Sequence, residues 1–128
     1  MMSAMPAFAL QCDPVRNLLR ISYHGRVTTA DARLLAGEAK IILPQLRPGF
    51  TVLTDLTHLD SMDLGCVPHV TGVMELCKAR GIGTTVRVIP DPRKDIGLKI
   101  LALTRYDSTA VRIITCQTMA EAEAAMGA

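Results

Sequence analysis

Residues 52–65 read VLTDLTHLDSMDLG, an apolar stretch that leads into acidic and hydroxyl-bearing residues. The apolar pattern begins at Phe50, so we expect a buried strand over Phe50–Leu56 and then a loop. Asp63 is placed to cap a helix that starts near Pro68, because a carboxylate there accepts amide hydrogen bonds and faces the positive end of the helix dipole. The stretch therefore predicts a strand–loop–helix unit.

The composition indicates one globular domain with an aliphatic core. Of the 128 residues, 49% are hydrophobic, 20% are charged and only 3% are aromatic. So few aromatic rings argue against a surface that stacks nucleic-acid bases, and a net charge of +2 is too small for a DNA- or membrane-binding surface. We expect residues 1–7 to be disordered or extended and residues 8–128 to form a single domain.

The sequence gives no indication of secretion, a membrane span or a metal site. The opening MMSAMPAFAL lacks the basic region and the continuous apolar stretch of a signal peptide, and no apolar run approaches the roughly 18 residues that a spanning helix needs. The cysteines lack the paired spacing of a zinc site. We therefore expect a cytoplasmic protein with reduced thiols and no cofactor; the four cysteines are Cys12, Cys66, Cys77 and Cys116.

Strand and helix patterns alternate along the chain. The stretches FALQC and LLRISYHGRV flank turn-rich residues 13–17 and predict a β-hairpin. Thr28 or Thr29 is expected to cap the first helix, Gly81 to end the second and Thr118 to cap the last. The expected order is β-β-α-β-α-β-α-β-α, with parallel strands and right-handed crossovers after the hairpin. The later elements are expected over 83–90 (strand), 94–106 (helix), 110–116 (strand) and 119–126 (helix).

Three arginines interrupt the apolar pattern of the predicted strands. A parallel strand buried on both faces is almost continuously apolar, but Arg20, Arg87 and Arg112 each stand between apolar neighbours. We therefore expect helices mainly on one face of the sheet and a basic stripe of these arginines on the other. Such a stripe would suit an acidic partner, an anionic head group or a second copy in a homodimer. Long side chains that simply cover apolar sheet would give the same pattern.

The order of elements resembles the STAS domain, the fold of bacterial anti-sigma-factor antagonists. The resemblance extends from about Phe8 to Met126 and is closest to small SpoIIAA-like or STAS/SEC14-like proteins. In those proteins a D-L-s-x-L-x-x-M loop and a V-R-V strand recur, as Asp55–Leu59 with Met62 and Val86–Val88 do here. The resemblance implies an α/β fold with an antiparallel first strand. It also implies a non-enzymatic regulatory module that binds a protein partner, such as a kinase or an anti-sigma factor.

The antagonists of that family are switched by phosphorylation of a serine in an Asp-Ser-Ser-Gly stretch at the start of the second helix. The phosphate adds about −2 charges beside the interface and expels the partner. An ungapped alignment places that serine at Leu64, whereas deleting three loop residues places it at Ser61. We prefer the ungapped alignment and expect the usual switch serine to be absent. The candidates for a partner or regulatory loop are Asp55, Thr57, Ser61 and Asp63, which simple turn and cap roles would also explain.

The SEC14-like side of the resemblance implies a second hypothesis, a carrier or sensor of a small apolar or anionic ligand. Parallel α/β sheets bind ligands beyond the carboxyl ends of their strands. Cys66 and His69 lie near a helix start, where a thiol pKa can be lowered, but they supply only two potential metal ligands. No nucleophile–base–orienter set is visible, so we expect no enzyme. Besides Asp55 and Thr57, the expected rim of a ligand pocket is Pro90, Asp91, Arg93 and Thr118.

Overall fold

The computed structural model describes residues 6–90 and 111–126, and its strands form a single mixed sheet. The strand order is β1-β2-β3-β4-β5, which follows the chain. The first two strands form an antiparallel hairpin, and each later strand is parallel to the one before it. The predicted α/β fold and its hairpin are confirmed. The strands are β1 (Phe8–Asp13), β2 (Leu18–Val27), β3 (Thr51–Met62), β4 (Thr84–Val88) and β5 (Arg112–Cys116).

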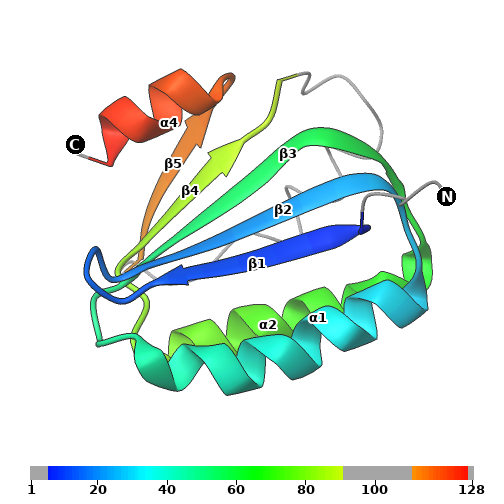
Figure 1. Ribbon diagram of the computed structural model, residues 1–128, viewed down its shortest axis with the longest axis horizontal. Coiled ribbons are helices and arrows are strands. Elements are labelled where there is room, and N and C mark those ends of the chain that lie inside the picture. Colours follow the sequence, from blue (N-terminus) through cyan, green and yellow to red (C-terminus); the bar gives the residue numbers. More distant parts are fainter. Residues whose placement is uncertain (1–5, 91–110, 127–128) are drawn as a thin grey trace, which may run out of the picture.

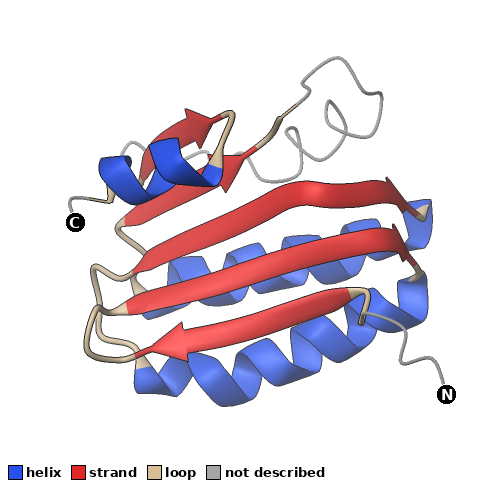
Figure 2. Ribbon diagram, turned by 45° about the horizontal axis from the view of Figure 1, so that its top comes forward, coloured by secondary structure: helices blue, strands red, loops and turns tan. Residues whose placement is uncertain are grey.

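The described helices lie on both faces of the sheet but cover them unequally. Helices α1 (Thr29–Ile42) and α2 (Val67–Arg80) lie side by side against one face, and the short helix α4 (Met119–Ala125) packs on the other face over β4 and β5 (Figures 1 and 2). A 3₁₀ turn, η1 (Leu43–Gln45), extends α1, and another, η2 (Leu64–Cys66), precedes α2. The helix expected over 94–106 lies outside the described residues.

The helix ends follow the local signals in the sequence. The Thr28 hydroxyl accepts a hydrogen bond from the backbone N–H of Asp31 at 3.3 Å, and the Asp31 carboxylate accepts one from the backbone N–H of Thr28 at 2.9 Å. These two bonds form a capping box, which satisfies two N–H groups at the start of α1. Gly81 ends α2 with a left-handed φ of 97°, and the Thr118 hydroxyl caps α4. The predicted caps at Thr28, Gly81 and Thr118 are confirmed.

Two apolar clusters stabilise the two faces of the sheet. The larger cluster fills the space between the sheet and the α1–α2 pair and includes the fully buried Phe50. The smaller cluster lies between the sheet and α4 and includes Leu53 and Ala122. Because both faces of β4 are covered in this way, four of its five residues are buried. The members of the smaller cluster are Leu18, Leu53, Val86, Val88, Cys116 and Ala122.

Strand β3 is longer than the sequence predicts. The pattern favours a strand that ends at Leu56, whereas β3 continues to Met62, so the predicted loop over residues 57–62 is wrong. The reason is its partner: β2 is ten residues long and pairs with β3 as far as Val27 opposite Met62. The register of this pairing shifts between Ser22 and His24 and again between Gly25 and Arg26.

The predicted basic stripe is also wrong, because Arg87 lies on the opposite face from the other two arginines. Val86 and Val88 pack in the cluster beneath α4, and successive side chains of a strand point to opposite faces. Arg87 therefore points to the α1–α2 side, where it is only 8% exposed and donates to the Thr115 hydroxyl at 3.0 Å. Burial lowers the pKa of its guanidinium from the ordinary value.

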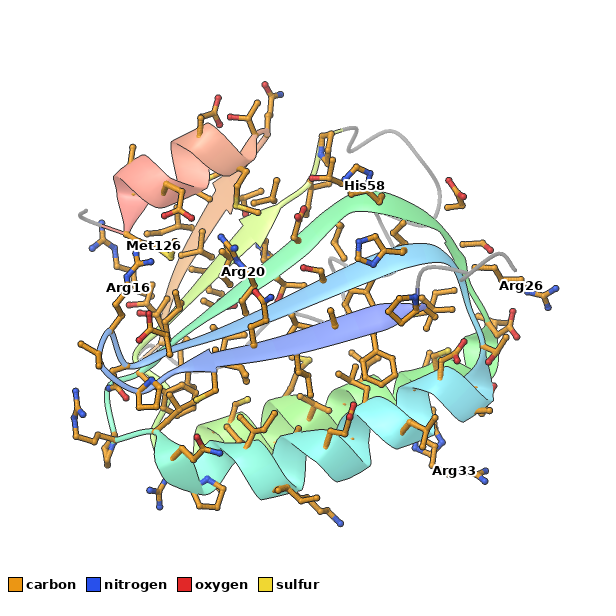
Figure 3. All side chains as sticks on the ribbon, viewed as in Figure 1. Arg16, Arg20, Arg26, Arg33, His58 and Met126 are labelled. Atoms are coloured by element: carbon orange, nitrogen blue, oxygen red, sulfur yellow. The ribbon has the colours of Figure 1, made fainter. Side chains whose placement is uncertain are left out.

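The other two arginines share the α4 side of the sheet but have different surroundings. Arg20 points from β2 toward α4 and donates to the Glu123 carboxylate at 2.8 Å (Figure 3). Arg112 is exposed on β5. Arg20 is thus tied to a packed helix and does not form part of a free basic surface.

Candidate functional site

The outer half of β3 has a neighbouring strand on one side only among the described residues. Strand β4 pairs with β3 only as far as Val88 opposite Asp55, whereas β2 continues beside β3 to Met62. This outer half leads through Asp63 directly into η2 and α2. We use the name β3–η2 surface for the exposed and half-buried polar side chains of this segment together with Leu64 at the start of η2; its members are Thr57, His58, Asp60, Ser61, Asp63 and Leu64.

Asp55 and Thr57 are brought together at the point where β4 leaves β3. The Asp55 carboxylate accepts hydrogen bonds from the backbone N–H of Thr57, at 3.0 Å, and from the Thr57 hydroxyl. A side chain that binds the backbone two residues further on stabilises a local bend. Both residues therefore have a structural role at the irregular part of the β2–β3 pairing.

Two histidines stack beside this bend, which sequence reasoning missed. The rings of His24 on β2 and His58 on β3 have centroids 5.6 Å apart and planes 11° apart. His58 is exposed at the outer half of β3 (Figure 3). The length of β2 is the signal in the sequence that could have indicated this pair. A ten-residue strand can pair with β3 beyond Leu56, and that longer pairing brings His24 opposite His58.

Asp63 does not cap the helix as predicted. Its carboxylate is instead bound by the Arg26 guanidinium, with Nε to Oδ1 at 3.1 Å and a second nitrogen to Oδ2 at 3.4 Å. The Arg26 side chain is 70% exposed, so water screens the ion pair and its contribution to stability is about 1 kcal/mol or less. The pair joins the end of β2 to the start of η2.

The start of η2 packs closely against the first turn of α1. A Cβ atom on Gly65 would lie 2.2 Å from the hydroxyl oxygen of Thr29 and 3.2 Å from its methyl carbon, so only glycine fits without a shift. The adjoining Leu64 is 70% exposed. A large apolar side chain is therefore displayed at the beginning of the second helical segment, on closely packed backbone.

The two positions considered for a switch serine lie in different structures. Leu64 is the first residue of η2, at the start of the helical segment. Ser61 lies within β3, opposite Arg26, and is half-buried. Of these two residues, Leu64 therefore lies at the start of a helical segment and Ser61 does not. Which of them corresponds to the serine that is phosphorylated in the family stays a prediction.

Cys66 is a core residue. Its side chain is fully buried, and the thiol contacts the backbone carbonyl of Val27 at 3.5 Å. Burial raises the pKa of this thiol, and the charge of Asp63 raises it further, so the lowered pKa considered from the sequence is wrong. Among residues 6–90 and 111–126, no group of three or more His, Cys, Asp or Glu side chains is arranged to hold a metal ion.

The expected ligand rim is only partly described. Pro90 is exposed after β4, and Thr118 caps α4, while Asp91 and Arg93 lie outside the described residues.

One apolar cavity lies between α2 and the sheet near Tyr23. The space in it that the centre of a water molecule can occupy has a volume of about 30 Å³, so the cavity has room for one or two waters. A more polar hollow lies between the β1–β2 turn and α4; its lining is Gln11, Cys12, Asp13, Arg16, Leu18, Arg20 and Glu123.

Solved structures share this fold along almost the whole chain. An uncharacterised protein with a SpoIIAA-like fold from Shewanella loihica PV-4 superposes with a TM-score of 0.66 at 14% identity, over 98% of both chains. The unphosphorylated anti-sigma factor antagonist SpoIIAA gives 0.64 at 18% identity, over 93% of this chain and 94% of that one. An anti-sigma factor antagonist from Mycobacterium paratuberculosis gives 0.57 at 17% identity, over 98% of both.

These similarities show that the chain has a SpoIIAA-like fold, as the sequence predicts. No protein-family model matches the chain, and no curated protein matches it significantly. In the part of the chain that the structure describes, none of the helices has the length and apolarity to cross a bilayer.

Proposed function

We propose that this chain is a single-domain, non-enzymatic regulatory module of the cytoplasm, which binds a protein partner through the β3–η2 surface. The observation in its favour is Leu64, an aliphatic side chain that is 70% exposed at the start of η2. Large apolar side chains displayed on a rigid support are typical anchors of protein interfaces. Two of the structural neighbours are described as anti-sigma factor antagonists, which is a role of this kind.

The surroundings of Leu64 suit a polar rim around an apolar anchor. The Asp63–Arg26 ion pair lies beside it, and Asp60 and His58 are exposed along the adjoining part of β3. Such rims exclude water and add specificity, while the central anchor supplies most of the binding energy. The tight contact between Gly65 and Thr29 holds the anchor in place before a partner arrives, which lowers the entropy cost of binding.

Regulation by the usual helix-start serine is not part of this proposal. Leucine has no hydroxyl, so a kinase cannot phosphorylate position 64. Intact-mass analysis of the protein from its native cells is expected to show no phosphate on Ser61. A phosphate found there would contradict the ungapped alignment.

The binding proposal is tested by affinity capture with matched variants. The bait is the wild-type chain, Leu64→Glu, or Val15→Glu, which changes a side chain that is 90% exposed in the β1–β2 turn. We expect a specific protein to be recovered with wild type and Val15→Glu and to be lost with Leu64→Glu. Equal recovery with all three baits, or no specific protein with wild type, would contradict the proposal.

The second hypothesis is that the chain carries a small anionic ligand, and the polar hollow beside α4 is where such a ligand would bind. Arg16 and Arg20 both line it, but Glu123 already contacts them at 3.7 Å and 2.8 Å. An anion would therefore have to displace Glu123. If the hollow is a ligand site, Glu123→Gln should strengthen the binding of inorganic phosphate in titration calorimetry, and no heat with either protein would count against it.

A further inference from the structure

Helix α1 displays an apolar stripe on its outer face. Leu34 is 63% exposed and Ile41 is 74% exposed, and both lie on the same side of the helix because they are seven residues apart. Ala30 and Gly37 are also exposed and complete the stripe. We call these four residues the α1 seam.

The spacing of the seam is that of a coiled-coil interface. Its members follow one another at intervals of four, three and four residues, which is the alternation of a and d positions in a heptad. The side chains that α1 buries against its own domain are Ala32, Leu35 and Ala39, which lie on the opposite side of the helix. The seam is therefore separate from the helix face that already packs in the domain core.

Gly37 adds to this pattern because it is a costly residue within a helix. Glycine in a helix interior is less favourable than alanine by about 1 kcal/mol. A Cβ atom there would meet nothing within 4 Å, so packing inside the chain does not require glycine. At the middle of a seam, a missing side chain lets a second backbone approach closely.

The charged residues beside the seam indicate which kind of helix would pack against it and in which direction that helix would run. Arg33 and Lys40 flank one edge, and Glu38 flanks the other; Arg33 projects from α1 on the side away from the sheet (Figure 3). With Leu34 at an a position, Arg33 takes the g position and Glu38 the following e position. In a parallel pair of helices, g of one chain meets this e position of the other, so Arg33 would pair with Glu38 twice by symmetry.

An antiparallel pair would have the opposite electrostatics. There, g positions meet g positions, which brings Arg33 close to Lys40 of the second copy. Like charges at such positions are destabilising. The seam is thus complementary to itself in the parallel direction only.

We propose that the α1 seam is the interface of a parallel, twofold-symmetric homodimer. The helix spans about 21 Å, so the contact is small and we expect a weak dimer, with a dissociation constant in the micromolar range. This interface differs from the open sheet face that the sequence suggested. Because η2 packs on the first turn of α1, the two β3–η2 surfaces would lie at the same end of the dimer.

The test is a charge-reversal cycle followed by sedimentation equilibrium between about 10 μM and about 1 mM. The variants are Arg33→Glu, Glu38→Arg and the double exchange. Neither position has a charged residue three or four places away on α1, so the reversals leave the helix itself unaffected. Circular dichroism melting serves as the control for folding.

We expect each single reversal to weaken the dimer about tenfold and the double exchange to restore it. Leu34→Glu should give a monomer, and Val15→Glu should leave the dimer unchanged. A wild-type chain that stays monomeric throughout the range would overturn the proposal. An Arg33→Glu variant that dimerises more tightly would also overturn it, because that result indicates the antiparallel arrangement.

Discussion

Replacing Gly65 with alanine tests the close packing that supports the β3–η2 surface. The added Cβ would lie 2.2 Å from the Thr29 hydroxyl oxygen, about 1 Å closer than an ordinary contact. Rotation of the Thr29 side chain gives little relief, because its Cβ and methyl carbon both lie 3.2 Å from the same point. The first turn of α1 and η2 must therefore move apart.

The cost of such overpacking is about 1–3 kcal/mol. We expect Gly65→Ala to lower the free energy of unfolding by about 2 kcal/mol, which corresponds to a urea midpoint lower by about 1 M and a melting temperature lower by roughly 6–10 °C. The assay is urea unfolding followed by far-ultraviolet circular dichroism, since the chain has no tryptophan.

Two further variants make the result specific to this contact. Gly72→Ala in α2 is the matched control: nothing lies within 4 Å of its added Cβ, so it should stabilise the protein by about 0.5–1 kcal/mol. In a Thr29→Ala background, Gly65→Ala should cost at least about 1 kcal/mol less than in wild type. If Gly65→Ala is as stable as wild type, or if Thr29→Ala gives no rescue, the packing argument is wrong.

Three other substitutions test the helix ends and a buried thiol. Thr28→Ala removes the capping box and should cost about 1 kcal/mol in urea unfolding; an unchanged midpoint would refute the cap. Gly81→Ala forces a side chain into a φ of 97° and toward Pro48, and we expect a loss of about 1–2 kcal/mol, with Gly81→Asn milder. Burial raises the pKa of Cys77 to about 12, so its thiol stays protonated in the folded state and ionises first in the unfolded state. Stability should then fall as the pH rises from about 9 to about 12, and less steeply in Cys77→Ala; equal slopes would contradict this.

The predictions that succeeded depend on local signals. Each of them depends on residues that lie within four positions of one another in the sequence. They are the turn after Asp13, the caps at Thr28 and Thr118 and the end of α2 at Gly81. Capping and turn energies act over the same short range, so the sequence alone predicts them well. The alternation of elements then fixed the topology.

The predictions that failed depend on long-range contacts. The sequence predicts a cap at Asp63, but Arg26, which lies 37 positions away in sequence, binds its carboxylate instead. Arg87 lies on a strand that is covered on both faces, so alternation with valines does not reveal which face an arginine takes. The extension of β3 also depends on a long-range contact, because β3 continues to Met62 beside the outer part of β2 (Leu18–Val27).

The sequential order of the sheet has a consequence for biosynthesis. Each parallel strand joins an edge that was made earlier in the chain, so β3 finds β2 already present as it leaves the ribosome. None of the five described strands has to be inserted between two others after translation. The domain is therefore suited to vectorial assembly, in which the hairpin, α1 and β3 form a template before β5 and α4 are synthesised.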